Sequence, residues 1–364
     1  MNSIRIQCLP GYRRKDKNVP RIGIIGGGAI GGLIAGHMTR NGVDVTLFDG
    51  WEENIQAVAK NGILLDGVQG EHRVEVNIQN MHAIESFRGE FDILVMAVKS
   101  YDTVAMVERS QHTLTKAGFI VSPQNGINEE QIAPIVGANR MIGCVTTVSA
   151  ELVGPGHVRQ TGSTSQSIGS GIAFTLGELD GSLTERLGET VELWQCAGPS
   201  RSTGNLWGER WCKLAINCMV NPTAAMTGLD NWEIRSNDQS RMIMFNLAAE
   251  AVRVGTSLGY HIPSPIGGFS IDDLYTAIVG GHRELEGKFV GSPPEIRGRP
   301  SLLQDISRGR KTEIDYLNGY VVRRGDEIGI KCAYNQGIST IIRGIESGEF
   351  SQSLDNLGRL EKLL

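Results

Sequence analysis

Three polar side chains recur at helical spacing within the segment 209–228. Lys213, Asn217 and Asn221 stand at i, i+4 and i+8, so a helix would place one amine and two amides on a single stripe. The stripe is flanked by apolar residues, namely Trp211, Leu214, Ile216, Met219 and Val220. An ammonium can give a proton to a reacting oxygen, so the pattern predicts a helix that presents a proton donor into a cleft. The alternative is a mildly amphipathic surface helix.

Two further polar residues lie about ninety positions later. Ser301 and Glu313 bracket the segment LLQDISRGRKT, and we expect their hydroxyl and carboxylate to reach the same cleft. Both also have a purely structural interpretation. Ser301 would then be a helix N-cap, and Glu313 an acid in the first turn of a helix.

A glycine-rich turn lies near the start of the chain. Gly26-x-Gly28-x-x-Gly31 follows the apolar run 21–26 and opens a helical pattern, with Ala29 and Ile30 inside the motif. Glycines at these positions allow a tight turn and close approach of the backbone to a pyrophosphate at a helix N-terminus. The turn therefore predicts a dinucleotide site, against the alternative of a glycine turn without a ligand.

Asp49 ends the second predicted strand, 43–49, about where a ribose hydroxyl would be held. A carboxylate accepts hydrogen bonds from a free 2′-hydroxyl and repels a 2′-phosphate, so NAD is the expected cofactor. NADP stays open, because Lys60 or Arg73 could reach a phosphate. The structural alternative is a strand-end aspartate that caps the next helix.

Lys99 and Asn125 each follow a predicted parallel strand, at the sheet edge where open α/β sheets bind ligands. We expect Lys99 to belong to the cofactor site and Asn125 to contact both cofactor and substrate. A solvated charge is the other interpretation for Lys99, and a plain turn is the other for Asn125-Gly126.

The elements that must position these residues form two domains. Alternating strand and helix patterns over 20–204 predict a doubly wound, mostly parallel Rossmann domain, which glycine-rich hairpin strands from 151 to 175 close. A linker is expected at 196–205, and an all-helical substrate and catalytic domain at 205–364. Residues 1–19 are predicted to be a disordered extension.

Composition bounds the class of protein. The chain has 364 residues, 40% hydrophobic and 21% charged, with a net charge of −5. These values indicate a soluble globular protein without broad attraction for nucleic acid or anionic membranes. Its six cysteines show no metal-ligand spacing, and no apolar run is long enough to span a bilayer. We expect a cytoplasmic homodimer that acts on a small molecule, without a metal, nucleic acid or membrane partner.

Together these residues resemble ketopantoate reductases (2-dehydropantoate 2-reductases) from position 21 to about 345. The most specific parts are SLLQDISRGRKTEIDYLNG at 301–319 and KLAINCMVNPTAAMTG at 213–228. The resemblance implies an NAD(P)-dependent oxidoreductase in which Lys213 protonates the substrate carbonyl as hydride arrives. It implies that Asn217, Asn221 and Ser301 hold the substrate, and that Glu313 orients the lysine or a substrate hydroxyl. Lys99 and Asn125 would lie near the nicotinamide ribose and the substrate.

Two departures from the family pattern limit the transfer of function, the first on the cofactor, where it favours NAD, and the second on the substrate. The second strand is followed by the acidic run Asp49-Gly-Trp-Glu-Glu, whereas NADP-using members usually carry a basic residue there. The loop 280–300, with His282, Arg283, Lys288, Arg297 and Arg299, is long and basic and either reshapes substrate access or has no role. The alternatives are therefore an NAD-dependent catabolic dehydrogenase of a bulkier secondary alcohol and a non-catalytic dinucleotide sensor.

Overall fold

The computed structural model describes residues 20–161, 171–263, 273, 276, 287, 289–290 and 298–364. The predicted extension 1–19 and almost all of the basic loop 280–300 lie outside the described residues. The chain forms two compact units. The first runs to Gln124 and resumes over Asn128–Leu206, whereas the second comprises Asn125–Ile127 and Trp207–Leu364.

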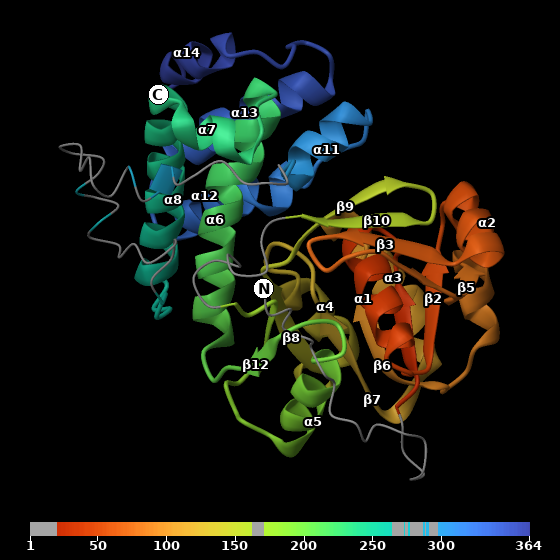
Figure 1. Cartoon of the computed structure of the whole chain (residues 1–364). Coiled ribbons are helices and arrows are strands. Elements are labelled where there is room, and N and C mark those ends of the chain that lie inside the picture. The colour runs from red at the N-terminus through yellow and green to blue at the C-terminus, as the bar shows by residue number, and fades with distance from the viewer. Residues whose placement is uncertain are drawn as a thin grey trace. The chain divides into compact units, whose positions relative to one another are not determined.

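An eight-stranded sheet organises the first unit (Figure 1). Its strands are β1 (Ile22–Ile25), β2 (Val45–Asp49), β5 (Asn77–Asn80), β6 (Phe91–Met96), β7 (Leu114–Ser122), β8 (Met141–Thr146), β11 (Phe174–Glu178) and β12 (Ser200–Ser202). Their order is β12-β11-β8-β7-β6-β1-β2-β5, and β11 is antiparallel to β8 whereas the other pairs are parallel. From β5 to β8, the strands lie in the Rossmann order 3-2-1-4-5-6 when they are numbered along the chain. The order of the strands therefore reverses between β1 and β6.

Helices cover both faces of this sheet. They are α1 (Ala29–Arg40), α2 (Glu52–Asn61), α3 (Thr103–Ser110), α4 (Glu129–Val136) and α5 (Glu185–Trp194), with 3₁₀ turns η1 (Met81–Ser86), η2 (Ser100–Asp102), η3 (Gln111–Thr113) and η4 (Ala138–Arg140). Along β6, Ile93 and Val95 pack into one hydrophobic cluster while Phe91, Leu94 and Met96 pack into another. Because side chains alternate along a strand, both faces are buried, which explains the unbroken apolar run.

A second, four-stranded sheet belongs to the same unit. It consists of β3 (Ile63–Gly67), β4 (His72–Val74), β9 (Ser149–Gly154) and β10 (His157–Thr161), in the order β4-β3-β10-β9. The hairpin strands expected from 151 to 175 are thus present as the antiparallel pair β9–β10, but that pair joins β3 in a separate sheet. The segment expected as a linker, 196–205, contains the edge strand β12.

The described part of the second unit is helical and contains no strand. Its elements are α6 (Leu206–Thr227), α7 (Asn231–Ser236), α8 (Asp238–Ser257), α11 (Ser301–Ser307), η5 (Ile314–Tyr316), α12 (Asn318–Glu327), α13 (Ala333–Glu346) and α14 (Asp355–Glu361). Helix α6 contributes Trp211, Leu214, Cys218 and Met219 to the hydrophobic core, so it is not a surface helix. No helix among the described residues is long and apolar enough to span a membrane.

The architecture agrees with the predicted class. A mostly parallel α/β sheet is followed by a helical region, as the change in hydrophobic periodicity near residue 205 indicates. The fold class is therefore confirmed.

Candidate active site

The glycine turn connects β1 to α1. Gly26 has φ +107°, a conformation that favours glycine, and a Cβ there would lie 2.9 Å from the backbone of Ala97 and Val98. A Cβ at Gly31 would collide with the carbonyl oxygen of Gly26. A Cβ at Gly28 would instead meet nothing within 4 Å. Two of the glycines are thus required by packing, and the third leaves open space at the helix N-terminus.

That N-terminus fits an anion. Gly28 is the N-cap of α1 and offers no side chain to the first amides of the helix, and the first turn contains no acidic residue. The amides near Ala29 and Ile30 have no partner within the helix, and the helix dipole favours negative charge there. A dinucleotide pyrophosphate matches this donor set. The residues that would hold it are Gly26, Gly28, Ala29, Ile30 and Gly31.

Asp49 ends β2 next to this turn. Its Oδ1 accepts hydrogen bonds from the backbone N–H of Gly50 at 2.7 Å and of Trp51 at 3.3 Å. A Cβ on Gly27 would lie 2.5 Å from Asp49 Oδ2, so the carboxylate faces the glycine turn. The helix-cap interpretation of Asp49 is wrong, because Trp51 is the N-cap of α2 and both amides that Asp49 Oδ1 accepts from precede the helix. These two bonds do not use up the carboxylate, whose two oxygens together can accept about four hydrogen bonds.

Asn54 on α2 fixes this carboxylate and was not identified from the sequence. Its Nδ2 donates to Asp49 Oδ2 at 2.5 Å and to the carbonyl of Gly27 at 3.2 Å. Its Oδ1 accepts from the N–H of Gly156, in the turn between β9 and β10, at 2.7 Å. One buried amide thus joins the strand-end acid, the glycine turn and the second sheet. A buried asparagine five residues after a strand-end acid is the only sequence signal for it.

Lys99 lies three residues after the end of β6. It is the N-cap of η2 and is partly exposed. The backbone before it is held by Gln124, whose Nε2 donates to the carbonyl of Val98 at 2.7 Å and to Thr103 Oγ1 at 2.8 Å. Lys99 therefore lies at the C-terminal end of β6, beside the point where the strand order reverses.

Asn125 belongs to the second unit, although it follows β7. The segment Asn125–Ile127 packs with that unit, and Ile127 is 5% exposed within its hydrophobic core. Asn217 Nδ2 on α6 donates to Asn125 Oδ1 at 3.0 Å. This hydrogen bond joins two of the predicted site residues.

The polar stripe of α6 lies in apolar surroundings. Asn217 and Asn221 are 5% and 6% exposed, and Lys213 is partly exposed. Desolvation by the surrounding protein lowers the pKa of Lys213 to about 8, and the nearby Cys212 opposes this with a smaller effect. An amine with such a pKa exchanges its proton near neutral pH, which suits a general acid or base.

Ser301 and Glu313 are polar residues of the second unit, of which Glu313 is buried and Ser301 is partly buried. Ser301 is the first residue of α11, after the N-cap Pro300, so the N-cap interpretation of Ser301 is wrong. Its buried Oγ has no hydrogen-bond partner among the described residues. Glu313 is 4% exposed and immediately precedes η5. An unpaired buried hydroxyl is costly unless a ligand completes it.

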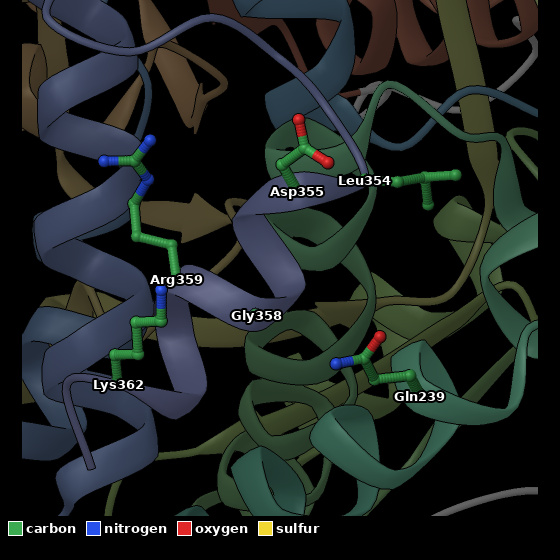
Figure 2. A pocket seen from close by; sticks show the side chains of 6 residues that line it. All are labelled: Gln239, Leu354, Asp355, Gly358, Arg359 and Lys362. Atoms are coloured by element: carbon green, nitrogen blue, oxygen red, sulfur yellow. The ribbon is translucent and has the colours of Figure 1, made fainter.

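The predicted site residues thus fall into two groups. The glycine turn, Asp49 and Lys99 lie in the first unit, and the other predicted residues lie in the second. The second unit also carries a surface pocket of about 560 Å³ at α8 and α14 (Figure 2). Its lining residues are Gln239, Leu354, Asp355, Gly358, Arg359 and Lys362, and none of them is a predicted site residue.

Two family models match consecutive parts of the chain. The model described as Ketopantoate reductase PanE/ApbA matches residues 22–172, and the model of the C-terminal region of the same family matches residues 205–346. The 2-dehydropantoate 2-reductase of Archaeoglobus fulgidus is 28% identical over 332 residues, which are 91% of this chain and 99% of that protein.

Solved structures share the fold. A PanE/ApbA family ketopantoate reductase from Ralstonia eutropha JMP134 has a TM-score of 0.72 and 27% identity, and covers 90% of this chain and 99% of its own. A D-mandelate dehydrogenase solved with NADH and anilino(oxo)acetate has the same TM-score and the same coverage at 20% identity. This second likeness shows the fold alone.

Proposed function

The chain belongs to the ketopantoate reductase family of NAD(P)-dependent oxidoreductases acting on CH–OH groups, and from this premise we propose its reaction. The protein transfers hydride between a nicotinamide cofactor and a 2-oxo or 2-hydroxy acid, with ketopantoate as the representative substrate. In the reductive direction, the ketone carbon gains hydride from the reduced nicotinamide and the carbonyl oxygen gains a proton. The products are the 2-hydroxy acid and the oxidised cofactor.

The observation that carries this proposal is the polar stripe of α6, in which both asparagines are buried and the pKa of the lysine is lowered by desolvation. Lys213 is the general acid, because its pKa of about 8 leaves it mostly protonated at neutral pH yet able to give up the proton. In the oxidative direction, the neutral amine takes the proton of the alcohol. Such proton transfer typically contributes about 10²–10⁴-fold in rate.

The remaining buried polar groups of the second unit bind the substrate. Asn217 and Asn221 offer amide donors to its carboxylate, and the unpartnered hydroxyl of Ser301 holds its hydroxyl or carboxylate. Glu313 orients the Lys213 amine or a substrate hydroxyl, and Asn125 supports Asn217 through their hydrogen bond. Because Asn217, Asn221 and Glu313 are buried, a substrate that leaves one of them unpaired is rejected.

The first unit holds the cofactor. The amides of the glycine turn bind the pyrophosphate, and Lys99 contacts the nicotinamide ribose. Asp49 faces the glycine turn and accepts hydrogen bonds from the hydroxyls of the adenine ribose, so NAD is preferred over NADP. The same carboxylate would repel a 2′-phosphate.

A substrate panel with both nicotinamides tests the reaction class. Ketopantoate and other 2-oxo acids should each be offered with NADH and with NADPH, and oxidation followed at the absorbance band of the reduced nicotinamide. We expect turnover of a 2-oxo acid with NADH. The pantoate assignment fails if ketopantoate is not reduced with either cofactor while another hydroxy compound reduces NAD.

The acid at position 49 also favours a second candidate. A catabolic dehydrogenase of a bulkier secondary alcohol would use NAD and the same lysine and asparagines. The panel should therefore include aromatic and branched 2-hydroxy acids in the oxidative direction.

A non-catalytic dinucleotide sensor is the third candidate, and it requires that Lys213→Ala leave function intact. We also propose that the protein is a cytoplasmic homodimer. Sedimentation of the purified protein tests its dimeric state.

A further inference from the structure

Helix α6 contains a proline next to one of its site residues. Pro222 lies inside the helix, one position after Asn221. Proline has no N–H, so the carbonyl of Cys218, four residues earlier, cannot receive its usual helical hydrogen bond. Cys218 is fully buried, and water therefore cannot replace that bond. The helix itself therefore supplies no donor to this carbonyl, which lies in the turn that separates Asn217 from Asn221.

Asn318 supplies the missing donor. It is the first residue of α12 and is fully buried, and its Nδ2 donates to the Cys218 carbonyl at 2.9 Å. One hundred residues separate the two positions in the sequence. This bond joins the segment 213–228 to the segment 301–319.

A chain of hydrogen bonds fixes the orientation of the Asn318 amide. The carboxylate of Glu250 on α8 only accepts, so the Asn335 Nδ2 that contacts it at 2.8 Å must be the donor. The Oδ1 of Asn335 consequently faces Asn318 and accepts from its Nδ2 at 2.9 Å. Both amide hydrogens of Asn318 are therefore used, one on Asn335 and one on Cys218. The arrangement leaves Asn318 Oδ1 buried with no partner among the described residues, a cost that the two donated bonds offset.

The bond lies where it can act on the site. Cys218 stands in the helical turn that carries Asn217 and Asn221, and Asn318 follows Glu313 by five residues. The N–H of Leu317, just before Asn318, donates to the carbonyl of Glu313 at 3.1 Å. One end of the bond thus lies in the turn of α6 that carries the two asparagines. The other end lies five residues after the buried Glu313.

We propose that Asn318 is a positioning residue, which replaces the helical hydrogen bond lost at Pro222 and so holds Asn217 and Asn221 in place relative to Glu313. The proposal rests on the proposed substrate site. Removing the amide lets the helix turn at Pro222 relax, which displaces the two asparagines while the cofactor residues of the other unit stay unchanged. Displacements of about 1 Å in a catalytic site can cost on the order of 10²-fold in rate.

A double-mutant cycle between Asn318→Ala and Pro222→Ala tests this role. The Pro222→Ala change restores an N–H that can donate to the Cys218 carbonyl. We expect Asn318→Ala alone to lower kcat/KM for reduction of the 2-oxo acid by about tenfold or more, with the Kd of NADH unchanged. In the Pro222→Ala background, the same change should lower kcat/KM by less than about threefold, because the N–H at position 222 already donates to the Cys218 carbonyl. Such non-additivity is expected of two residues that act on the same group. Equal losses in both backgrounds overturn the proposal.

Asn246→Ala is the matched control. Asn246 Nδ2 on α8 donates to the carbonyl of Met242 at 2.9 Å, but that carbonyl keeps its helical donor because position 246 has an N–H. Loss of the Asn246 amide should change kcat/KM by less than about twofold, which corresponds to about 0.4 kcal/mol. If Asn318→Ala does not fold, the double variant decides. A folded, active double variant supports the proposal, and a double variant that fails like the single one refutes it.

The thermal unfolding midpoint of the four proteins of the cycle separates this result from the substrate assignment. A coupling between positions 222 and 318 in the midpoint does not depend on the substrate. If the wild type reduces no 2-oxo acid, the proposed function fails while this coupling is still measured. If the midpoint shifts while kcat/KM of the folded variants is unchanged, Asn318 is structural only and its positioning role is refuted.

Discussion

Asn217 on helix α6 donates a hydrogen bond to Asn125, which follows strand β7, although 92 residues separate them. Asn125 Oδ1 accepts this bond, so the NH₂ group of Asn125 points away from Asn217. The short segment Asn125–Ile127 packs as part of the helical unit and presents its amide beside the α6 stripe. The proposed substrate-binding groups therefore come from two distant segments of the chain.

This pair should behave as one unit. Asn217→Ala removes the donor and Asn125→Ala removes the acceptor, and each should raise KM for the 2-oxo acid by about tenfold, the effect of one or two kcal/mol. The double variant should lose little more than either single one, because residues in contact are not additive. Steady-state kinetics of the three variants checks this, and strictly multiplicative losses would contradict it.

Lys213 should determine the pH dependence of the reaction. Reduction needs the ammonium, so its kcat/KM should be level at low pH and fall as the pH rises through about 8. Oxidation needs the neutral amine, so its kcat/KM should rise through the same pH. Lys213→Ala should lower kcat by about 10²–10⁴-fold in both directions.

An ordinary thiol also titrates near this pH, and Cys212 is adjacent to the lysine. Cys212→Ser is therefore the control. The alkaline limb should persist in that variant, displaced slightly to lower pH because the thiolate no longer favours the ammonium. Loss of the limb would assign it to the thiol instead.

Ser301 should show a trade-off between stability and substrate binding. Its buried hydroxyl lacks a partner among the described residues, so Ser301→Ala removes an unsatisfied group and should leave the unfolding midpoint unchanged or slightly raised. The same change should raise KM for the substrate by roughly tenfold, since the hydroxyl is lost from the site. A clear drop in the midpoint with unchanged KM would show that the hydroxyl serves the fold.

The sequence predicts those features that depend on local pattern. The apolar run of β6 indicates a strand buried on both faces, and the spacing of Lys213, Asn217 and Asn221 predicts their common helix. Features that depend on distant pairing are not visible in this way. The parallel pairing of β10 with β3 creates a second sheet from strands about 90 residues apart, so the hairpin β9–β10 was expected but its partner was not.

The same reasoning explains one residue that was missed and one structural alternative that was wrong. Asn54 acquires its role from partners 27 and 102 residues away, Gly27 and Gly156. Ser301 has a residue type and place that suggest an N-cap, yet Pro300 occupies that position, and the hydroxyl has no partner in the part of the chain that the structure describes. Tertiary contact decides these assignments, and a single sequence gives no period or motif for it.

Asp49 should set the cofactor preference. Asp49→Ala should narrow the ratio of the Kd values for NADPH and NADH, and Asp49→Arg should invert it, because a guanidinium pairs with the 2′-phosphate that a carboxylate repels. Fluorescence titration of the reduced cofactors gives both Kd values. Tighter binding of NADPH than of NADH by the wild type would refute the role assigned to this residue.

Asn54 should affect cofactor binding without touching the substrate. Asn54→Ala frees Asp49 Oδ2 and the Gly27 carbonyl from their common donor and leaves the N–H of Gly156 without its acceptor. We expect the Kd of NADH to rise about tenfold and its advantage over NADPH to shrink, with KM for the 2-oxo acid at saturating cofactor unchanged. Gln56→Ala is the control on the same helix, because Gln56 Nε2 bonds only the exposed Glu52 Oε1 among the recorded contacts. If Asn54→Ala weakens NADH and NADPH equally, the amide supports the fold of this corner and does not orient Asp49.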